Sequence, residues 1–270
     1  MKEARPPAIT DRSFFRAYQE ALQPEMPAAL WDAFAAQEGL PPVRYAFQAS
    51  AVYSSNIEGN TLDLNSYMRS KMRGGAGPKS KERREIDELV EAYEFARGHA
   101  LTEKNLLRAH GILSRSILPA SQQGAYRVGR MFVFDSRGII YAAVEAEHVA
   151  DEMRAFFEDV KRLRRVDLSV DEAFYHAAMM HLVFVHVHPF EDGNGRTARL
   201  LEKWFLTSRL GPRAWQIPSE EYYWKHRPAY YQAIRLGPDF YTVRYEPEPP
   251  EWGGCVPFLT LLPKSLRAIP

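Results

Sequence analysis

The sequence predicts a mainly helical protein that carries one β-hairpin, and three observations support this fold class. Apolar residues recur at helical spacing along most of the chain. Ser169 and Glu172 can form a capping box at the start of a long apolar helix. Within 129–144, two short β-prone runs flank the turn sequence Asp-Ser-Arg-Gly, which is typical of a hairpin.

The first well-marked helix is expected over 46–59, where residues on one face recur at spacings of four, three and four. Gly59 can end this helix. The basic, glycine-bearing stretch 69–84 is predicted to be a loop that enters the next helix. The further expected helices are 84–100, a helix that Thr102 can N-cap, 146–163, 173–187 and 197–210.

The composition indicates a soluble globular chain. Of its 270 residues, 46% are hydrophobic and 13% aromatic, which is enough for a substantial core. A net charge of +1 favours neither a nucleic-acid nor a membrane partner, and the basic run 69–84 is more typical of a solvated loop. The single Cys255 excludes an intramolecular disulfide framework. No spanning apolar run and no signal-peptide centre is visible, so a cytoplasmic location is expected.

One short stretch, HPFEDGNGRTAR at 188–199, lies between two expected helices. The residue before Pro189 is pushed away from helical geometry, so the preceding helix must end near Val187. The following glycines at 193 and 195 let the backbone turn its N–H groups outward, which makes an anion nest at the positive end of the next helix.

The charged side chains of this stretch suit phosphate chemistry. Arg196 and Arg199 are three residues apart and can reach one ligand from the same helix. Asp192 can hold Mg²⁺, which characteristically bridges a carboxylate and substrate phosphates. His188, with an ordinary pKa of about 6.5, is a natural general base for an attacking hydroxyl. Together these groups indicate phosphoryl or nucleotidyl transfer.

HPFEDGNGRTAR also resembles the Fic (Fido) signature, His-x-Phe-x-Asp/Glu-Gly-Asn-Gly-Arg-x-x-Arg, at every specified position. The resemblance implies a Fic-type helical domain that transfers AMP from ATP to a protein hydroxyl and releases pyrophosphate. By position, His188 would deprotonate the target hydroxyl and Asp192 would bind Mg²⁺. The nucleotide-binding residues that it implies are Gly193, Asn194, Gly195 and Arg196 at the α- and β-phosphates and Arg199 at the γ-phosphate.

The resemblance extends over about 45–235. GAYRVGR (124–130) and the hairpin after it look like the family's Gly-x-Tyr-Arg segment and its flap. Such a flap would hold the Tyr, Ser or Thr segment of a target protein by strand-like pairing. The flap residues expected to dock the target are Met131, Phe132, Val133 and Ile140.

A second motif, SSNIEGN at 54–60, resembles the family's inhibitory Ser/Thr-x-x-x-Glu-Gly/Asn helix. It is carried here by Ser54, Glu58 and Gly59, and it implies that Glu58 pairs with Arg199. A carboxylate there would occupy the partner of the γ-phosphate and misplace ATP. The other interpretations are a solvated Glu58 near a helix end, or a Glu58 that orients a water for removal of AMP.

The tail segment 219–234 looks like a family stretch that lies beside the nucleotide. Tyr230 or Tyr231 could stack on adenine there, and Tyr231 is the chosen nucleotide-binding candidate, although plain packing explains these rings equally well. His226 and Lys203 depart from residues that relatives often carry, which bears on the choice of nucleobase. The three histidines on the apolar helix lack metal-pair spacing and are interpreted as packing or polar-network residues: His176, His181 and His186.

The leading hypothesis is an autoinhibited protein adenylyltransferase that uses ATP and Mg²⁺. Three regions are expected: 1–103 with the inhibitory helix at about 45–59, the catalytic core 104–245, and the tail 246–270. Inhibition would act within the chain, or across a homodimer if the helix swaps. Two alternatives stay open: a Fic-fold enzyme that transfers another phosphoryl group or removes AMP, and a non-catalytic nucleotide-sensing or protein-binding module.

Overall fold

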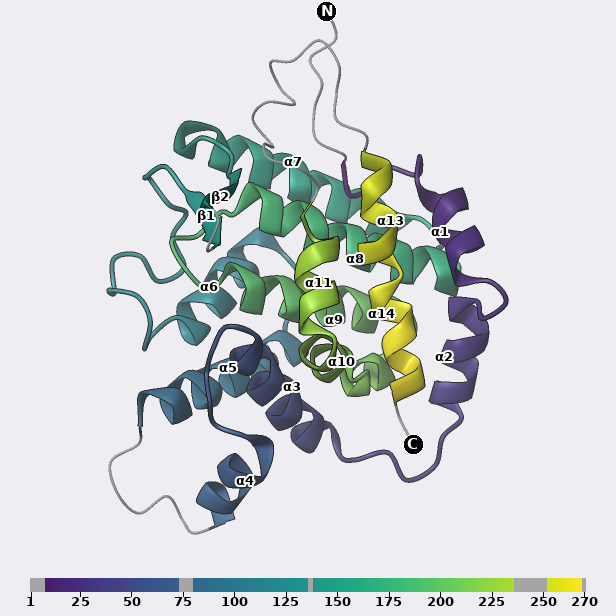
Figure 1. Cartoon of the computed structure of the whole chain (residues 1–270), viewed down its shortest axis with the longest axis horizontal. Coiled ribbons are helices and arrows are strands. Elements are labelled where there is room, and N and C mark those ends of the chain that lie inside the picture. The colour runs from purple at the N-terminus through teal and green to yellow at the C-terminus, as the bar shows by residue number, and fades with distance from the viewer. Residues whose placement is uncertain (1–7, 73–79, 136–137, 236–251, 269–270) are drawn as a thin grey trace, which may run out of the picture.

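The computed structural model describes residues 8–72, 80–135, 138–235 and 252–268. Its helices surround a central pair, α8 and α9, which pack closely against each other (Figure 1). The elements are α1 Phe15–Leu22, α2 Pro27–Ala35, α3 Val43–Ile57, α4 Leu64–Met72, α5 Lys81–Arg97, α6 Glu103–Leu113, β1 Phe132–Asp135, β2 Gly138–Ala142, α7 Ala146–Arg165, α8 Val170–Val187, α9 Asn194–Leu210, η1 Pro212–Gln216, α10 Ser219–Lys225, α11 Arg227–Ala233, η2 Trp252–Cys255, α13 Val256–Leu259, α14 Leu261–Lys264 and η3 Ser265–Ala268.

The mainly helical fold class is confirmed, and local capping explains several helix starts. Thr102 accepts a hydrogen bond from the backbone of Asn105, and Ser169 and Glu172 form the predicted capping box. The helix α8 ends at Val187, next to the proline that restricts its predecessor. These caps fix both ends of the segment that leads into the 188–199 motif.

Several helix boundaries differ from the sequence prediction. The first four residues of the predicted loop 69–84 belong to α4, which runs to Met72, and α5 begins already at Lys81. Residues 73–79 lie outside the described part of the chain. The helix predicted over 197–210 begins three residues earlier, at Asn194, because Gly193 before it takes a left-handed conformation with φ 81°. The amides of Asn194 and Gly195 therefore belong to the first helical turn.

One hydrophobic core connects the three predicted regions. Buried side chains from the N-terminal helices, from α8 and α9, and from the last described helices belong to a single cluster. The helix α13 packs against α1 and α8, and α14 packs against α2. The region boundaries at 103/104 and 245/246 stay a prediction.

The strands β1 and β2 pair as a two-stranded antiparallel hairpin within the range where the sequence predicts one. Phe132 pairs with Ala142, and the register shifts between Val133 and Phe134. The hairpin is anchored to the preceding chain by a bond from the Ala143 amide to the Met131 carbonyl, at 3.0 Å. The predicted range, 129–144, includes residues 136–137, which lie outside the described residues.

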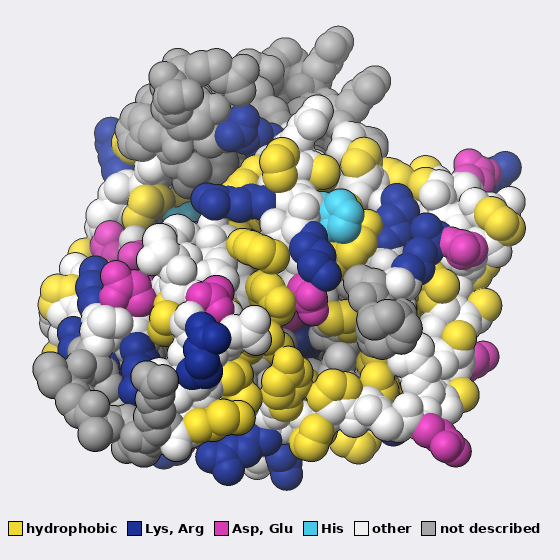
Figure 2. All heavy atoms as spheres, turned by 60° about the horizontal axis from the view of Figure 1, so that its bottom comes forward, with side chains coloured by type: hydrophobic (Ala, Val, Ile, Leu, Met, Phe, Trp, Pro, Cys, Tyr) yellow, Lys and Arg dark blue, Asp and Glu magenta, His cyan; other side chains and the backbone are white. Residues whose placement is uncertain are grey.

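The surface seen in Figure 2 carries lysine, arginine, aspartate and glutamate side chains interspersed among hydrophobic ones. This mixture agrees with the small net charge of the chain. Among the described helices, none is both long and apolar enough to cross a bilayer.

Candidate active site

The predicted motif forms the connection between α8 and α9, and it begins with a backbone reversal at His188. His188 has φ 50° and ψ 59°, the one positive φ at a non-glycine position among the described residues. A residue other than glycine rarely adopts this left-handed conformation, and such strain is concentrated at functional sites. The reversal carries the chain from the end of α8 to the loop that starts at Pro189.

Arg127, just before the hairpin, holds this reversal in place. Its side chain is 2% exposed and donates to the carbonyls of His188 at 2.6 Å and Gly129 at 2.8 Å. It also donates to the carbonyls of Val144 and Val187. The buried guanidinium therefore ties the end of α8 to both flanks of the hairpin. Its own amide donates to the Pro189 carbonyl at 2.9 Å, so the Gly-x-Tyr-Arg segment is a structural brace for the motif.

The imidazole of His188 is oriented by the last turn of α8. Its Nδ1 lies 3.2 Å from the Val185 carbonyl, which can only accept, so Nδ1 carries the proton and Nε2 is the acceptor nitrogen. Burial, helped by the charge of Arg127, lowers the pKa of His188 from 6.5 to about 4. His188 is therefore neutral near pH 7, which is the protonation state that a general base needs.

The loop between the two helices is closed by the side chain of Asn194. Its Oδ1 accepts from the Phe190 amide at 3.0 Å and its Nδ2 donates to the Phe190 carbonyl at 2.8 Å. Asn194 is 2% exposed, so its side chain is committed to the loop. Its backbone N–H, in contrast, belongs to the first turn of α9, where amides point outward and can bind an anion.

His110 of α6 supports the same loop, and sequence reasoning assigned it only to a helix. Its ring stacks on Phe190, with centroids 3.5 Å apart and an interplanar angle of 4°. Its Nδ1 accepts from the Gly124 amide at 3.0 Å, so its Nε2 donates to the Asp192 carbonyl, also at 3.0 Å. The motif loop is thus fixed from one side by His110 and from another by Arg127. The pattern 188–199 contains no signal for either contact.

Arg196 and Asp192 form a weakly coupled pair at the start of α9. The Arg196 Nη2 lies 3.3 Å from Asp192 Oδ1, and Nη1 lies 3.8 Å from Glu85 Oε2. The Arg196 side chain is only 6% exposed, yet within the described ranges its Nε has no hydrogen-bond partner. A buried guanidinium with long contacts and a donor without a hydrogen-bond partner is typical of a site that binds an anion.

Asp192 is placed so that it could hold a hard cation beside that anion. Its side chain is 54% exposed, and its Oδ1 accepts from the Gly193 amide at 2.5 Å as well as from Arg196. Both contacts use the same oxygen, so Oδ2 can still be offered to a metal ion. A single carboxylate next to a phosphate site is the arrangement that Mg²⁺ characteristically uses.

Arg199 is completely buried one turn further along α9, and α3 supplies most of its partners. Its Nη2 donates to Glu58 Oε1 at 2.6 Å and to the Ser54 carbonyl at 3.1 Å, and its Nε donates to Ser54 Oγ at 2.8 Å. The structure therefore brings together the two motifs that sequence analysis paired. The Glu58 carboxylate also lies against Gly195, at the positive end of α9.

The pKa of Glu58 reflects this placement. Burial alone would raise it, but the charge and the hydrogen bond of Arg199 outweigh burial and lower the pKa of Glu58 below 4.5. Burial opposes the charge of Arg199 as well, yet the neighbouring Tyr230 and Glu58 raise the pKa of Arg199 above its ordinary value. Glu58 and Arg199 are therefore both ionised near neutral pH, and the contact between them is a charged one.

The two tail tyrosines occupy different positions. Tyr230 is 2% exposed, and its hydroxyl contacts Arg199 and His181. Tyr231 is half-buried, and its hydroxyl donates to the Ile57 carbonyl at 3.0 Å, beside the end of α3. Of the two, only Tyr231 keeps part of its ring accessible to a nucleobase.

The three histidines of α8 are part of polar networks, as the sequence predicts. His176 Nδ1 lies 2.8 Å from the Ile9 carbonyl, and His186 Nε2 lies 3.0 Å from the Ile234 carbonyl. His181 lies between Tyr230 and Glu202. His226, by contrast, is exposed at the end of α10, where its ring nitrogen Nδ1 lies 2.8 Å from the Tyr222 carbonyl.

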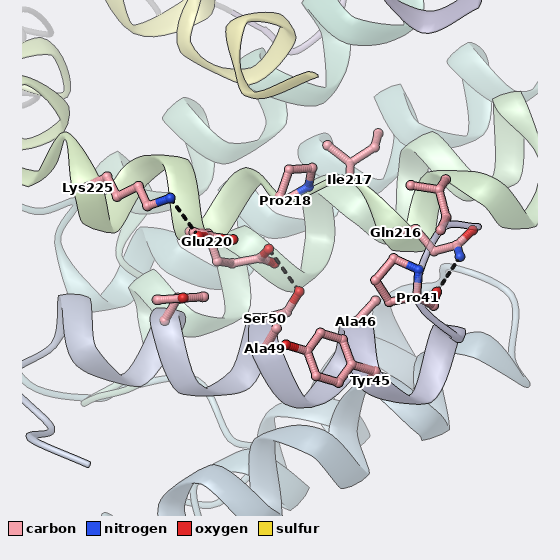
Figure 3. A pocket seen from close by; sticks show the side chains of 13 residues that line it. Pro41, Tyr45, Ala46, Ala49, Ser50, Gln216, Ile217, Pro218, Glu220 and Lys225 are labelled. Atoms are coloured by element: carbon pink, nitrogen blue, oxygen red, sulfur yellow. Dashed lines mark hydrogen bonds and ion pairs between the residues drawn. The ribbon is translucent and has the colours of Figure 1, made fainter. Parts of the chain in front are cut away.

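Lys203, the other departure from the family pattern, is buried one turn after Arg199. Its Nζ lies 2.5 Å from Glu220 Oε2 and donates to Ser50 Oγ at 2.6 Å. Figure 3 shows Ser50 of α3 pointing toward Glu220 of α10, beside a cavity of about 300 Å³. The helix α3 is therefore fastened to α9 at two successive turns, through Lys203 and through Arg199.

The predicted flap residues are placed only in part. Met131 is half-buried and Phe132 is 42% exposed, next to the Arg127 brace. Val133 and Ile140 lie on β1 and β2, and their side chains lie outside what the structure describes.

Comparison with known proteins agrees with this geometry. Residues 100–206 match the Fic/DOC family. The protein adenylyltransferase Fic of Nematostella vectensis is 30% identical over 172 residues, and that of Drosophila erecta is 27% identical over 193. These alignments cover 59% and 68% of this chain, but only 37% and 36% of the relatives. The chain thus spans little more than a third of the length of these curated relatives.

Solved structures show the same fold. A Fic family protein from Desulfovibrio desulfuricans aligns with a TM-score of 0.70 and 22% identity, over 97% of this chain and 73% of that one. Fic-1 (residues 134–508) from C. elegans aligns with a TM-score of 0.62 and 19% identity, over 95% and 69%. Residues 100–206 of this chain therefore carry the match to the Fic/DOC family, within a fold that solved Fic proteins share.

Proposed function

We propose that this chain is a protein adenylyltransferase that transfers AMP from ATP to a Tyr, Ser or Thr hydroxyl of a target protein, and that Glu58 inhibits it. The observation that carries the transfer reaction is the state of Arg196. It is a buried guanidinium at a helix N-terminus, held only by long contacts and with Nε unpartnered among the described residues. An anion such as a phosphate supplies what this group lacks.

The reaction follows from the groups around that anion. The α-phosphate would lie against the first-turn amides of Asn194 and Gly195 and the guanidinium of Arg196. His188, with Nε2 as the acceptor nitrogen, would take the proton of the target hydroxyl. The target oxygen then bonds to the α-phosphorus while the bond from that phosphorus to the β-phosphate oxygen breaks. Pyrophosphate leaves and AMP stays on the target.

A divalent cation fits the same arrangement. Asp192 would hold Mg²⁺ through Oδ2, and the ion would neutralise charge on the phosphates that it bridges. The brace that Arg127 makes between the motif and the hairpin would keep a target docked on β1 or β2 in a fixed position relative to His188.

The position of the Glu58 carboxylate supports inhibition. It lies against Gly195 and bonds to Arg199, which places a negative charge where phosphate oxygens would have to lie. The Glu58 carboxylate would repel phosphate oxygens at this position, so ATP could bind only with its phosphates displaced. A displaced α-phosphate is poorly aligned for in-line attack, and small misplacements reduce rates strongly.

The experiment compares wild type, Glu58→Gly and Glu58→Gly/His188→Ala. Each is incubated with Mg²⁺, cell lysate, and ATP labelled at either the α- or the γ-phosphate. We expect α-label on protein, a large increase with Glu58→Gly, and loss of the label with the double change. Transfer of γ-label would replace this proposal with a kinase-like reaction. A Glu58→Gly protein that is no more active than wild type would overturn the inhibitory role of Glu58.

A further inference from the structure

The hydrogen bonds of Arg199 divide unequally between α3 and the rest of the molecule. Three of them go to α3, namely to Ser54 Oγ, the Ser54 carbonyl and Glu58 Oε1. Among the described residues, one partner lies elsewhere: the hydroxyl of Tyr230 on α11, which accepts from Nη1 at 3.2 Å. Any movement that withdraws the end of α3 from Arg199 leaves Tyr230 as the remaining contact.

Tyr230 is itself held by a chain of buried polar groups. Its hydroxyl oxygen lies 2.9 Å from Nε2 of His181, and Nδ1 of His181 lies 2.9 Å from Oε1 of Glu202. A guanidinium can only donate, so the Tyr230 oxygen accepts from Arg199 and its proton is available for His181 Nε2. That direction places the His181 proton on Nδ1, the nitrogen nearest the Glu202 carboxylate, although the two groups do not have hydrogen-bond geometry among the described residues. Burial raises the pKa of Tyr230 above its ordinary value, so the hydroxyl keeps its proton.

Burial makes this chain important for the charge of Arg199. Arg199, His181 and Glu202 are all 0% exposed. A buried cation that loses its anionic partner is strongly destabilised unless another negative charge remains nearby. Glu202 lies three residues after Arg199 on the same helix, and its carboxylate lies beside His181, the partner of Tyr230. It is a buried negative charge that does not belong to α3.

The same contacts exclude stacking of Tyr230 on adenine. Its ring lies between Tyr223, at a centroid distance of 5.0 Å, and Phe258, at 5.9 Å. With 2% of the residue exposed, no face of the ring is available to a nucleobase.

Resting on the function proposed above, we propose that Tyr230 is a positioning residue for Arg199, backed by His181 and Glu202. In the inhibited chain it shares Arg199 with Ser54 and Glu58. When Glu58 withdraws, the Tyr230 hydroxyl still holds Nη1, the nitrogen that Ser54 does not contact, and so keeps the guanidinium directed at the γ-phosphate of ATP. Tyr230 affects nucleotide binding only through Arg199. Because Arg199 is proposed to contact the γ-phosphate, Tyr230 should matter for binding of ATP and not of ADP.

A comparison of ATP with ADP tests this role, because a general packing defect would weaken the binding of both nucleotides. The parent protein is Glu58→Gly/His188→Ala, which cannot turn over nucleotide. Binding of ATP and of ADP, each with Mg²⁺, is measured by calorimetry for the parent and with Tyr230→Phe added. We expect the Kd of ATP to rise about tenfold, the size of one lost hydrogen bond to a charged group, and that of ADP to stay within twofold.

The matched control is Tyr175→Phe in the same parent. Tyr175 is also a fully buried tyrosine, but its hydroxyl donates to the Asp11 carbonyl at 2.9 Å, away from Arg199. We expect it to change neither Kd. Glu202→Gln, which keeps the shape and removes the charge, should weaken ATP binding in the same selective way as Tyr230→Phe.

The inference is overturned if Tyr230→Phe leaves ATP binding unchanged, or if the affinities for ATP and ADP fall together. Failure of the proposed function looks different. In that case the parent itself would bind no ATP, or would bind ATP no better than ADP before Tyr230 is changed, and the inference would fall with it.

Discussion

Gly195 and Glu58 approach so closely that a β-carbon built on Gly195 would lie 2.4 Å from Glu58 Oε1. The nearest atom outside Glu58 would be Arg199 Nη1, at 3.1 Å. The glycine is therefore needed where the carboxylate is present. It allows the Glu58 oxygen to take the place of an anion at the first turn of α9.

This contact predicts that the effect of Gly195→Ala on the free energy of unfolding depends on Glu58. In wild type the new methyl group collides with Glu58, and we expect the chain to lose stability. In Glu58→Gly only the tight approach to Arg199 Nη1 remains, and alanine is favoured over glycine in a helix by about 0.5–1 kcal/mol, so we expect a clearly smaller loss. Chemical denaturation of the four proteins measures the coupling as a double-mutant cycle. Equal effects in both backgrounds would show that the two residues are not in contact.

The contact of Ser50 with Lys203 and Glu220 predicts partial activation on the other side of α3. Ser50→Ala removes one buried hydrogen-bonding group, worth about 1 kcal/mol, which would increase release of α3 roughly fivefold. We expect a comparable increase in AMP transfer, smaller than that of Glu58→Gly, in the assay with α-labelled ATP. In the Glu58→Gly background Ser50→Ala should add nothing.

The control for that prediction is Ala49→Leu, on the same helix. Ala49 lines the cavity beside the contact, so the larger side chain has about 300 Å³ to occupy. We expect transfer to remain at the wild-type rate. If Ala49→Leu activates as much as Ser50→Ala, the effect comes from general disturbance of α3 and not from the buried contact.

We expect Asn194→Ala to reduce both stability and activity, because the Asn194 side chain closes the motif loop. Asn194→Ala leaves the amide and the carbonyl of Phe190 without their partner in a buried place. We expect unfolding to become easier by about 1–3 kcal/mol and transfer by the Glu58→Gly protein to fall. Asn105→Ala, at a half-buried asparagine of α6 whose side-chain bond to the Ala100 carbonyl is exposed, should change stability little. An Asn194→Ala protein as stable as wild type would contradict the role of the side chain in the loop.

The sequence predicts this site better than it predicts the surroundings of the site. Residues 188–199 and 54–60 are local patterns that resemble two motifs of one family, and that resemblance implied their pairing through Arg199 and Glu58 before the structure was known. His110 and Arg127 contact the motif across the fold, and their partners are backbone carbonyls and amides that carry no side-chain signature. Neither contact could be recognised before the positions of α6 and the hairpin were known.

Segment 219–234 shows a second kind of information that the sequence does not contain. Tyr230 and Tyr231 are adjacent and identical in type, so the sequence offers no reason to prefer one for adenine. The structure separates them, because α11 turns Tyr230 into the core toward Arg199 and leaves Tyr231 half-buried beside Ile57. The start of α9 was predicted three residues late for a related reason. The left-handed turn at Gly193 is a backbone property that depends on how the loop closes.

His110 predicts how stability depends on pH. Burial lowers its pKa from 6.5 to about 4, and the neighbouring charges of Arg196 and Asp192 act on it in opposite directions. The unfolded chain therefore binds more protons between these values, so the stabilisation is complete above about pH 6.5 and is lost as the pH falls toward 4. Each such histidine removes about 1.4 kcal/mol per pH unit in that window. We expect Tm to fall steadily from pH 7 to pH 5.

The variant His110→Gln measures how much of this pH dependence of stability comes from His110. Glutamine has a carbonyl oxygen to accept from Gly124 and an amide to donate to the Asp192 carbonyl, and it does not titrate. We expect it to be less stable than wild type at pH 7.5 because the stacking on Phe190 is lost. Between pH 6.5 and 5, however, its Tm should fall less steeply, with His176, His186 and His188 still titrating. Parallel curves for the two proteins would show that His110 is not the group that acid protonates.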